Sequence, residues 1–163
     1  MNLIVAVTEN WGIGCENKLL FRVSEDQRYF KSMTSGKVVV MGHNTFKSLP
    51  GGRPLKNRKN IVLSRDVALS IEGVTVCNSI EQLLTLIKNY DMSNVYVIGG
   101  EAIYTALLPY CNKAYITKFQ AMPSADTFFP NVDEMPEWEV MEEHMQMEYD
   151  GLRYKFYVYE RRF

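Results

Sequence analysis

The sequence contains few cysteines, few histidines and no excess of charge of either sign. Its three cysteines, Cys15, Cys77 and Cys111, are far apart and in no paired spacing, which argues against a disulfide framework and against a zinc site. Free thiols are typical of a reducing compartment, so we expect a cytoplasmic protein. Only His43 and His144 are present, without an HExxH or GxSxG pattern, and we expect neither a metal site nor a hydrolytic nucleophile.

The charge balance and the short apolar runs exclude further classes. Lysine plus arginine number 18 and aspartate plus glutamate 19, so no long-range field would attract nucleic acid or an anionic membrane. No apolar run approaches the ~20 residues of a transmembrane helix, and residues 1–7 lack the basic segment of a signal peptide. The 163 residues have the length of one domain, and we expect a monomer whose single domain spans residues 1–163.

Short apolar runs alternate with segments of helical character. The runs are rich in valine and isoleucine and end in turn residues, which is typical of strands covered on both faces. They are residues 3–7, 38–41, 61–63 and 95–98. Ser24 and Gln27 form a capping-box pattern that predicts Ser24 as the N-cap of a helix reaching Met33. Ser79 opens a second helix, and residues 101–108 and 43–48 give two more.

The C-terminal third has a different pattern. Strands are expected at residues 114–119, 138–147 and 154–161, with a turn at Asp150-Gly151. Residues 50–54 are expected to form a tight surface loop. The sequence therefore predicts a three-layer α/β fold, with a mixed, mainly parallel central sheet and an antiparallel C-terminal edge.

Distinctive residues follow the apolar runs, where ligands bind in open α/β sheets. Gly42-His43-Asn44-Thr45 opens a helix and suits a phosphate, although this segment alone is more often an ordinary N-cap. Ser64-Arg65 could hold another phosphate, or Arg65 could be a solvated charge. Gly99-Gly100 indicates a close backbone approach, or a plain turn. Gly12 to Asn17 lacks the last glycine of GxGxxG, so a dinucleotide site would be non-classical.

Asp26 and the segment before it have two interpretations each. A carboxylate in the first turn of a helix usually complements the helix dipole. A functional Asp26 would have to face inward beside Phe30, which its spacing of four residues allows. Residues 11–23, flanked by Trp11 and Phe21, form either a mobile lid or a packed surface loop.

Together these elements resemble the dihydrofolate reductase family over essentially all 163 residues. The motifs that carry the resemblance are Ala6-Val7, Trp11 to Asn17, Asp26 with Phe30, Val40 to Phe46, Leu49, Arg53-Pro54-Leu55, Arg58, Asn60 to Arg65, Ile98-Gly99-Gly100 with Tyr104, and Ala125 to Pro130. No single motif is decisive, but their order and spacing are specific. The resemblance implies reduction of dihydrofolate to tetrahydrofolate by hydride transfer from NADPH, for one-carbon metabolism, and implies antifolates as inhibitors.

The resemblance also implies roles for individual residues. Asp26, backed by Thr117, would bind the 2-amino and N3 side of the pterin, and Arg58 would pair with the α-carboxylate of the glutamate tail. The residues expected to act near the reacting atoms are Asp26, Leu19, Phe21, Tyr104 and Thr117. The expected substrate-binding residues are Ile4, Val5, Ala6, Asp26, Phe30, Leu49, Arg53, Leu55, Arg58 and Ile98. The expected cofactor-binding residues are Ala6, Ile13, Gly14, Leu19, Gly42, His43, Asn44, Thr45, Leu63, Ser64, Arg65, Gly99, Gly100, Glu101, Ala102, Ile103 and Tyr104.

Several residues differ from the pattern of the family. Phe21 stands where many bacterial members carry tryptophan, Leu20 and Ser24 replace prolines, Gln27 replaces an apolar residue and His43 replaces a frequent arginine. In the implied chemistry, Asp26 orients and stabilises charge, while a water supplies the proton to N5. Two alternatives remain: a pyrimidinone reductase of riboflavin biosynthesis, which would not need Asp26 and Arg58 in these roles, and a non-catalytic NADP-binding sensor.

Overall fold

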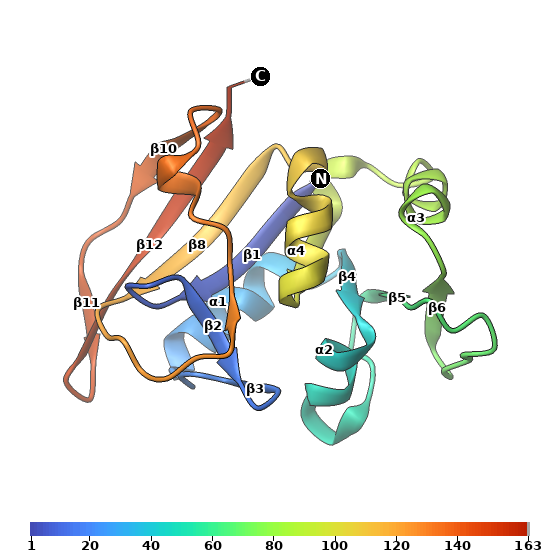
Figure 1. Cartoon of the computed structure of the whole chain (residues 1–163), viewed down its shortest axis with the longest axis horizontal. Coiled ribbons are helices and arrows are strands. Elements are labelled where there is room, and N and C mark those ends of the chain that lie inside the picture. The colour runs from blue at the N-terminus through green and yellow to red at the C-terminus, as the bar shows by residue number, and fades with distance from the viewer. Residues whose placement is uncertain (163) are drawn as a thin grey trace.

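The computed structural model describes residues 1–162 and is built around a nine-stranded mixed sheet (Figure 1). The strand order is β10-β12-β8-β1-β7-β4-β5-β6, and β11 pairs with β12. The strands from β8 to β6 are parallel, whereas β12 is antiparallel to β8, β10 and β11. The bounds are β1 Asn2–Val7, β4 Val38–Gly42, β5 Lys59–Leu63, β6 Val74–Cys77, β7 Val95–Gly99, β8 Lys113–Phe119, β10 Trp138–Glu143, β11 Met147–Tyr149 and β12 Leu152–Arg161. The predicted fold class is confirmed.

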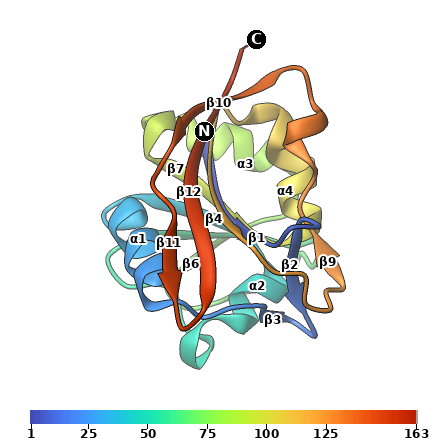
Figure 2. The same ribbon diagram turned by 90° about the vertical axis from the view of Figure 1, so that its left-hand side faces the viewer.

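Four α-helices cover the two faces of this sheet. Figure 2 shows α1 on one side, with α3 and α4 on the other. Strand alternation explains the layers, because Val38 and Val40 pack with α3 and α4, while Val39 and Met41 pack with Phe46 of α2. The helices are α1 Ser24–Thr34, α2 His43–Ser48, α3 Ile80–Ile87 and α4 Glu101–Leu107, and short 3₁₀ turns cover Pro50–Gly52, Met92–Asn94, Leu108–Tyr110 and Val132–Glu134.

A second, three-stranded sheet lies at the edge of the first. Its strands are β2 Gly12–Cys15, β3 Lys18–Leu19 and β9 Thr127–Phe128, in the order β3-β2-β9. Residues 11–23, expected as a lid or a surface loop, therefore contain two short strands. Within residues 1–162, no helix is long and apolar enough to cross a membrane.

Two local expectations were wrong, and β6 was not predicted. Ser24 is the first residue of α1 rather than its N-cap, which is Val23, and the N–H of Gln27 donates to the Val23 carbonyl at 3.0 Å. Val23 is buried among aromatic residues, and this packing places the start of the helix one residue earlier than the capping pattern does. The strand expected at residues 138–147 is divided into β10 and β11, after an irregular register in β10. The sequence analysis also missed β6.

Candidate functional site

The carboxyl ends of the parallel strands bring most of the predicted residues to one edge of the sheet. Strands β1, β4, β5 and β7 are in parallel register, so the residues that follow them emerge at the same edge. Gly42 pairs with Leu63, which places the start of α2 beside Ser64. The predicted phosphate-binding segments are therefore neighbours in space.

Asp26 lies in the first turn of α1 and is bonded to the central sheet. The hydroxyl of Thr117, on β8, donates to Oδ1 of Asp26 over 2.8 Å, and Thr117 is itself buried. Burial raises the pKa of Asp26, and the hydrogen bond from Thr117 opposes this rise. Asp26 is thus a half-buried carboxyl on the inward side of its helix, which the dipole-cap interpretation does not predict.

Tyr104, on α4, is bonded to the central sheet. Its hydroxyl donates to the Ile4 carbonyl at 2.7 Å, so α4 is tied to β1 across β7. The peptide bond between Gly99 and Gly100 is cis. A Cβ added to Gly99 would lie 3.4 Å from Oγ1 of Thr45, and one added to Gly100 would lie 3.3 Å from it. Gly99 also has a φ of 126°, a conformation that favours glycine, so glycine at these two positions lets the start of α2 lie close to the end of β7.

The two predicted phosphate sites consist mainly of accessible donors. Gly42 caps α2 without a side-chain hydrogen bond, which leaves the first N–H groups of the helix for other partners. At the end of β5, the hydroxyl of Ser64 accepts from the N–H of Asp66 at 3.1 Å, and Arg65 is exposed. These groups have the chemistry of an anion site.

Arg58 is held in place by the end of α1 rather than by a carboxylate. Its Nη1 donates to Oγ1 of Thr34 at 3.0 Å and its Nε to the Lys56 carbonyl at 2.8 Å. Burial lowers the pKa of Arg58. These two bonds fix the guanidinium plane and leave its remaining N–H donors for an anionic ligand.

Asp26, Phe30 and Thr34 mark one side of α1 at intervals of four residues. Eight residues separate Asp26 from Thr34, which corresponds to about 12 Å along the helix axis. The carboxyl of Asp26 and the guanidinium beside Thr34 are therefore suited to the two ends of one elongated molecule. Leu49, Leu55 and Ile98 pack on an adjacent apolar cluster.

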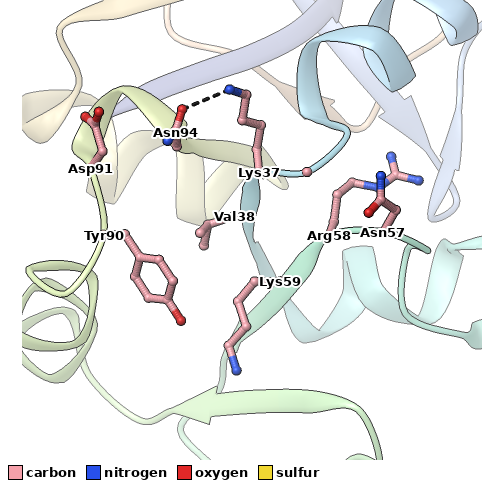
Figure 3. Close-up of a pocket in the computed structure, with 9 residues that line it drawn as sticks. Lys37, Val38, Asn57, Arg58, Lys59, Tyr90, Asp91 and Asn94 are labelled. Atoms are coloured by element: carbon pink, nitrogen blue, oxygen red, sulfur yellow. Dashed lines mark hydrogen bonds between the residues drawn. The ribbon is translucent and has the colours of Figure 1, made fainter.

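A cavity of about 410 Å³ lies elsewhere, at the amino ends of β4, β5 and β7 (Figure 3). It is lined by Lys37, Val38, Lys59 and Tyr90, among others. Arg58 is the one predicted site residue in its lining, and Figure 3 shows the guanidinium directed away from Val38 and Tyr90. The other residues that line this cavity are not predicted site residues.

The remaining predicted residues vary in burial. Ile4, Val5, Leu63, Gly14 and Gly99 are buried; Ala6, Ile13, Phe21, Phe30 and Ile103 are half-buried; Leu19, Asn44, Arg53, Glu101 and Ala102 are exposed. Phe21 packs on Phe119, with 5.1 Å between ring centroids. Leu19 is 61% exposed and Arg53 is exposed in the loop after α2, so these two are the least integrated of the predicted residues.

The structure also adds contacts that sequence reasoning missed. Oδ2 of Asp126 accepts from the N–H of Glu16 at 2.9 Å and connects the segment before β9 to the turn between β2 and β3. Phe129 is buried and meets Tyr104 edge to face, with 5.1 Å between centroids. The partners lie far apart along the chain, and no local pattern marks such pairs.

Comparisons with known proteins agree with the sequence resemblance. The profile of the family described as dihydrofolate reductase matches residues 1–161. The chain is 36% identical to dihydrofolate reductase of Staphylococcus haemolyticus and 35% identical to that of Bacillus subtilis strain 168, in each case over 99% of this chain and 95% of the relative. The solved structure of dihydrofolate reductase from Enterococcus faecalis, complexed with NADP(H) and RAB-propyl, has a TM-score of 0.89 at 32% identity and covers 99% of this chain and 96% of its own.

Proposed function

This chain belongs to the dihydrofolate reductase family, and from that premise we propose which of its residues perform the reaction. The chain reduces 7,8-dihydrofolate to 5,6,7,8-tetrahydrofolate by hydride transfer from NADPH, and so supplies one-carbon metabolism. We assign the substrate to the side of α1 that carries Asp26 and Phe30. We assign the cofactor to the ends of β4, β5 and β7.

The observation that carries this assignment is the hydrogen bond between Thr117 and Asp26. It holds a carboxyl group at the same sheet edge as Tyr104 and the paired glycines, Gly99 and Gly100. The other acidic residue of α1, Glu25, accepts instead from the hydroxyl of Tyr154 on β12 at 3.0 Å. Asp26 therefore orients the pterin through its 2-amino and N3 side, with Thr117 fixing the carboxyl in place.

The cofactor assignment rests on Gly99-Gly100 and on the hydrogen-bond donors around these glycines. The backbone at Gly99-Gly100 and the start of α2 fit a dinucleotide, because side chains there do not block the approach to backbone N–H groups. NADPH, when bound, supplies the hydride that is transferred from C4 of its nicotinamide to C6 of the pterin. His43, Asn44 and Thr45 hold the pyrophosphate, and Ser64 with Arg65 holds the 2′-phosphate. Ala6, Ile13, Leu19 and Tyr104 border the nicotinamide.

The protein contributes position and electrostatics to this reaction. Burial raises the pKa of Asp26, so its charge acts in surroundings that screen it poorly and favours a protonated pterin. A carboxylate on the 2-amino side cannot readily reach N5, and a water delivers that proton. Arg58 binds the α-carboxylate of the glutamate tail at the other end of α1, far from the reacting carbons.

The same proposal extends to the whole protein. We infer a single functional domain over residues 1–163, acting as a cytoplasmic monomer, in which the three cysteines remain free. Antifolates that carry a diaminopyrimidine ring would occupy the same position beside Asp26, since the paired amino groups of such a ring match a carboxylate.

The test is a spectrophotometric assay of NADPH oxidation in the presence of dihydrofolate. The unmodified protein should consume NADPH only when dihydrofolate is added, with one NADPH oxidised per tetrahydrofolate formed. Asp26→Asn should lose most of this activity while still binding NADPH. Normal turnover by Asp26→Asn would remove Asp26 from the proposed site.

A further inference from the structure

Lys118 has an unusual set of neighbours on the side of β8 that faces β2. Its ammonium nitrogen lies 5.0 Å from the ring centroid of Trp11, 4.8 Å from that of Tyr157 and 5.3 Å from that of Tyr159. The same nitrogen is 2.7 Å from Oδ2 of Asp133. A cation within about 6 Å of an aromatic face is attracted by it, and here three rings and one carboxylate surround a single charge.

Members of this group are also hydrogen-bonded to one another. The hydroxyl of Tyr159 donates to Oδ1 of Asp133 at 2.7 Å, so both oxygens of this carboxylate are engaged. Asp133 belongs to the 3₁₀ turn Val132–Glu134 and Tyr159 belongs to β12. The ammonium therefore contacts two parts of the chain besides Trp11: Asp133 in the 3₁₀ turn, and Tyr157 and Tyr159 on β12.

Trp11 is the member of this group with an unfavourable backbone conformation. It has a φ of 65°, a backbone conformation that is unfavourable for a bulky residue unless its side chain gains compensating contacts. It lies in the turn between β1 and β2, where its N–H donates to the Thr8 carbonyl at 3.0 Å. The contacts of its ring with Lys118 and with Phe129 are contacts of this kind.

From Trp11, two routes lead to the residues assigned to the nicotinamide. Along the backbone, Trp11 is followed by β2, which carries Ile13 and Gly14. Through side chains, the ring of Trp11 stacks on Phe129 at 6.3 Å, and Phe129 meets Tyr104 edge to face at 5.1 Å. The Phe129 N–H also donates to the Trp11 carbonyl at 2.8 Å.

We propose that Lys118 is a positioning residue of the reductase. Its ammonium holds the ring of Trp11 in place, and Trp11 in turn positions β2 and Tyr104 beside the nicotinamide. The proposal rests on the assignment of Ile13, Gly14 and Tyr104 to the cofactor. Thr117 and Lys118 are adjacent on β8 and point to opposite sides of it, so one strand orients Asp26 on one side and Trp11 on the other.

Lys155 offers a matched control. It pairs with Lys118 across β8 and β12, its side chain is 28% exposed against 27% for Lys118, and it too forms an ion pair, with Glu143 at 3.3 Å. Within residues 1–162, the ammonium of Lys155 does not lie over an aromatic ring. Removing either charge relieves the same repulsion between the two lysines, but only Lys118→Met removes the cation from Trp11.

The first measurement is single-turnover reduction of dihydrofolate at saturating NADPH. Lys118→Met should slow the step about tenfold and change the KM for dihydrofolate less than about twofold, because a small misplacement of reacting groups costs rate rather than binding of the distant tail. Lys155→Met should keep the parental rate. Lys118→Arg, which keeps the cation over the rings, should recover at least about half of the parental rate.

The second measurement does not depend on activity. The chain has two tryptophans, so in a Trp138→Phe background the fluorescence comes from Trp11 alone. Lys118→Met should shift the Trp11 emission and alter its quenching by NADPH, while Lys155→Met should do neither. Because no dihydrofolate is present, this measurement separates failure of the Lys118–Trp11 contact from failure of the proposed reaction.

The proposal also predicts coupling between the two residues. Since Lys118 acts through Trp11, the double variant Lys118→Met/Trp11→Leu should be no slower than the slower single variant. Parental single-turnover rates in Lys118→Met, or an equal loss in Lys155→Met, would overturn the proposal. If Lys118→Met does not fold, Trp11→Leu decides in its place: it should be slowed about tenfold, and a parental rate would equally overturn the proposal.

Discussion

The carboxyl group of Asp26 is held between α1 and β8, where burial raises its pKa above the ordinary 3.8. A raised pKa means that the folded protein holds this proton more tightly than the unfolded chain does. Below both pKa values the carboxyl is neutral in both states, and its ionisation does not affect the free energy of unfolding. As the pH rises through the pKa of Asp26 in the unfolded chain, the unfolded state ionises first. The free energy of unfolding therefore falls until the pH has passed the pKa of Asp26 in the folded protein.

Asp26→Asn should therefore stabilise the protein at neutral pH while impairing catalysis. The free energy of unfolding at pH 7 should rise on the order of 1 kcal/mol, since the amide retains an acceptor for Thr117 and removes the desolvated charge. The difference should vanish at a pH below the ordinary carboxyl range. Urea unfolding across pH measures it, with Glu148→Gln, at an exposed carboxylate of β11, as control. A variant less stable than the parent at pH 7 would contradict the account.

Arg58 should contribute to binding rather than to the chemical step. Arg58→Leu should raise the KM for dihydrofolate far more than it lowers kcat, with a loss of about 2 to 4 kcal/mol if the ion pair is desolvated. The reason is that the tail binds equally well before and during hydride transfer. Steady-state kinetics measure the split, and a substrate lacking the glutamate carboxylates is the control. If the two proteins still differ with that substrate, Arg58 acts elsewhere.

At the scale of elements, the proposed cofactor site lies where strands β4, β5 and β7 end. The start of α2 and the end of β5 are neighbours through the pairing of Gly42 with Leu63, which brings Thr45 and Ser64-Arg65 to one place. Neither segment alone distinguishes a phosphate site from an ordinary cap or a solvated charge. Their adjacency supports a site for the 2′-phosphate that distinguishes NADPH from NADH.

Arg65→Ser should reduce this preference. We expect kcat/KM for NADPH to fall about tenfold, which corresponds to about 1.4 kcal/mol, because one charge-assisted hydrogen bond is lost. The value for NADH should stay within about twofold of the parent. Arg22→Ser, at an exposed arginine before α1, serves as control. Equal kcat/KM for the two cofactors in the parent would contradict the assignment.

The elements that could be predicted are those with a strong local signal. The buried strands β1, β4, β5 and β7 and the Ser79 cap of α3, whose side chain accepts from the Gln82 N–H, are visible in the sequence. The small sheet is not, because β2 pairs with β9 more than a hundred residues away. The start of α1 was misplaced because burial of Val23 outweighs the capping pattern at Ser24. Patterns among neighbouring residues do not reveal strand pairing or burial that depends on distant parts of the chain.

At the scale of the whole molecule, the carboxyl ends of the parallel strands carry the proposed reaction and their amino ends carry the cavity, which shares Arg58 with the proposed site. The candidate site could be predicted through the order and spacing of its motifs, since each motif alone has an ordinary structural explanation. Contacts between distant residues could not be predicted from the sequence, and they include those of Asp126 with Glu16 and of Lys118 with Trp11. The first contact joins the segment before β9 to the turn after β2, and the second joins β8 to the turn before β2, so both depend on the folded chain.

The central claim is that Asp26 faces the pterin, and hydride transfer by Asp26→Asn in single turnover across pH tests it most directly. Transfer should slow by ~10² to 10⁴ at pH 7, the usual range for a group that assists proton transfer or stabilises charge. The variant's rate should keep rising as pH falls after the parent's has levelled, since solvent then protonates the substrate unaided. NADPH affinity should hardly change. A near-parental rate at pH 7 would contradict the account and leave Asp26 as a helix-capping charge.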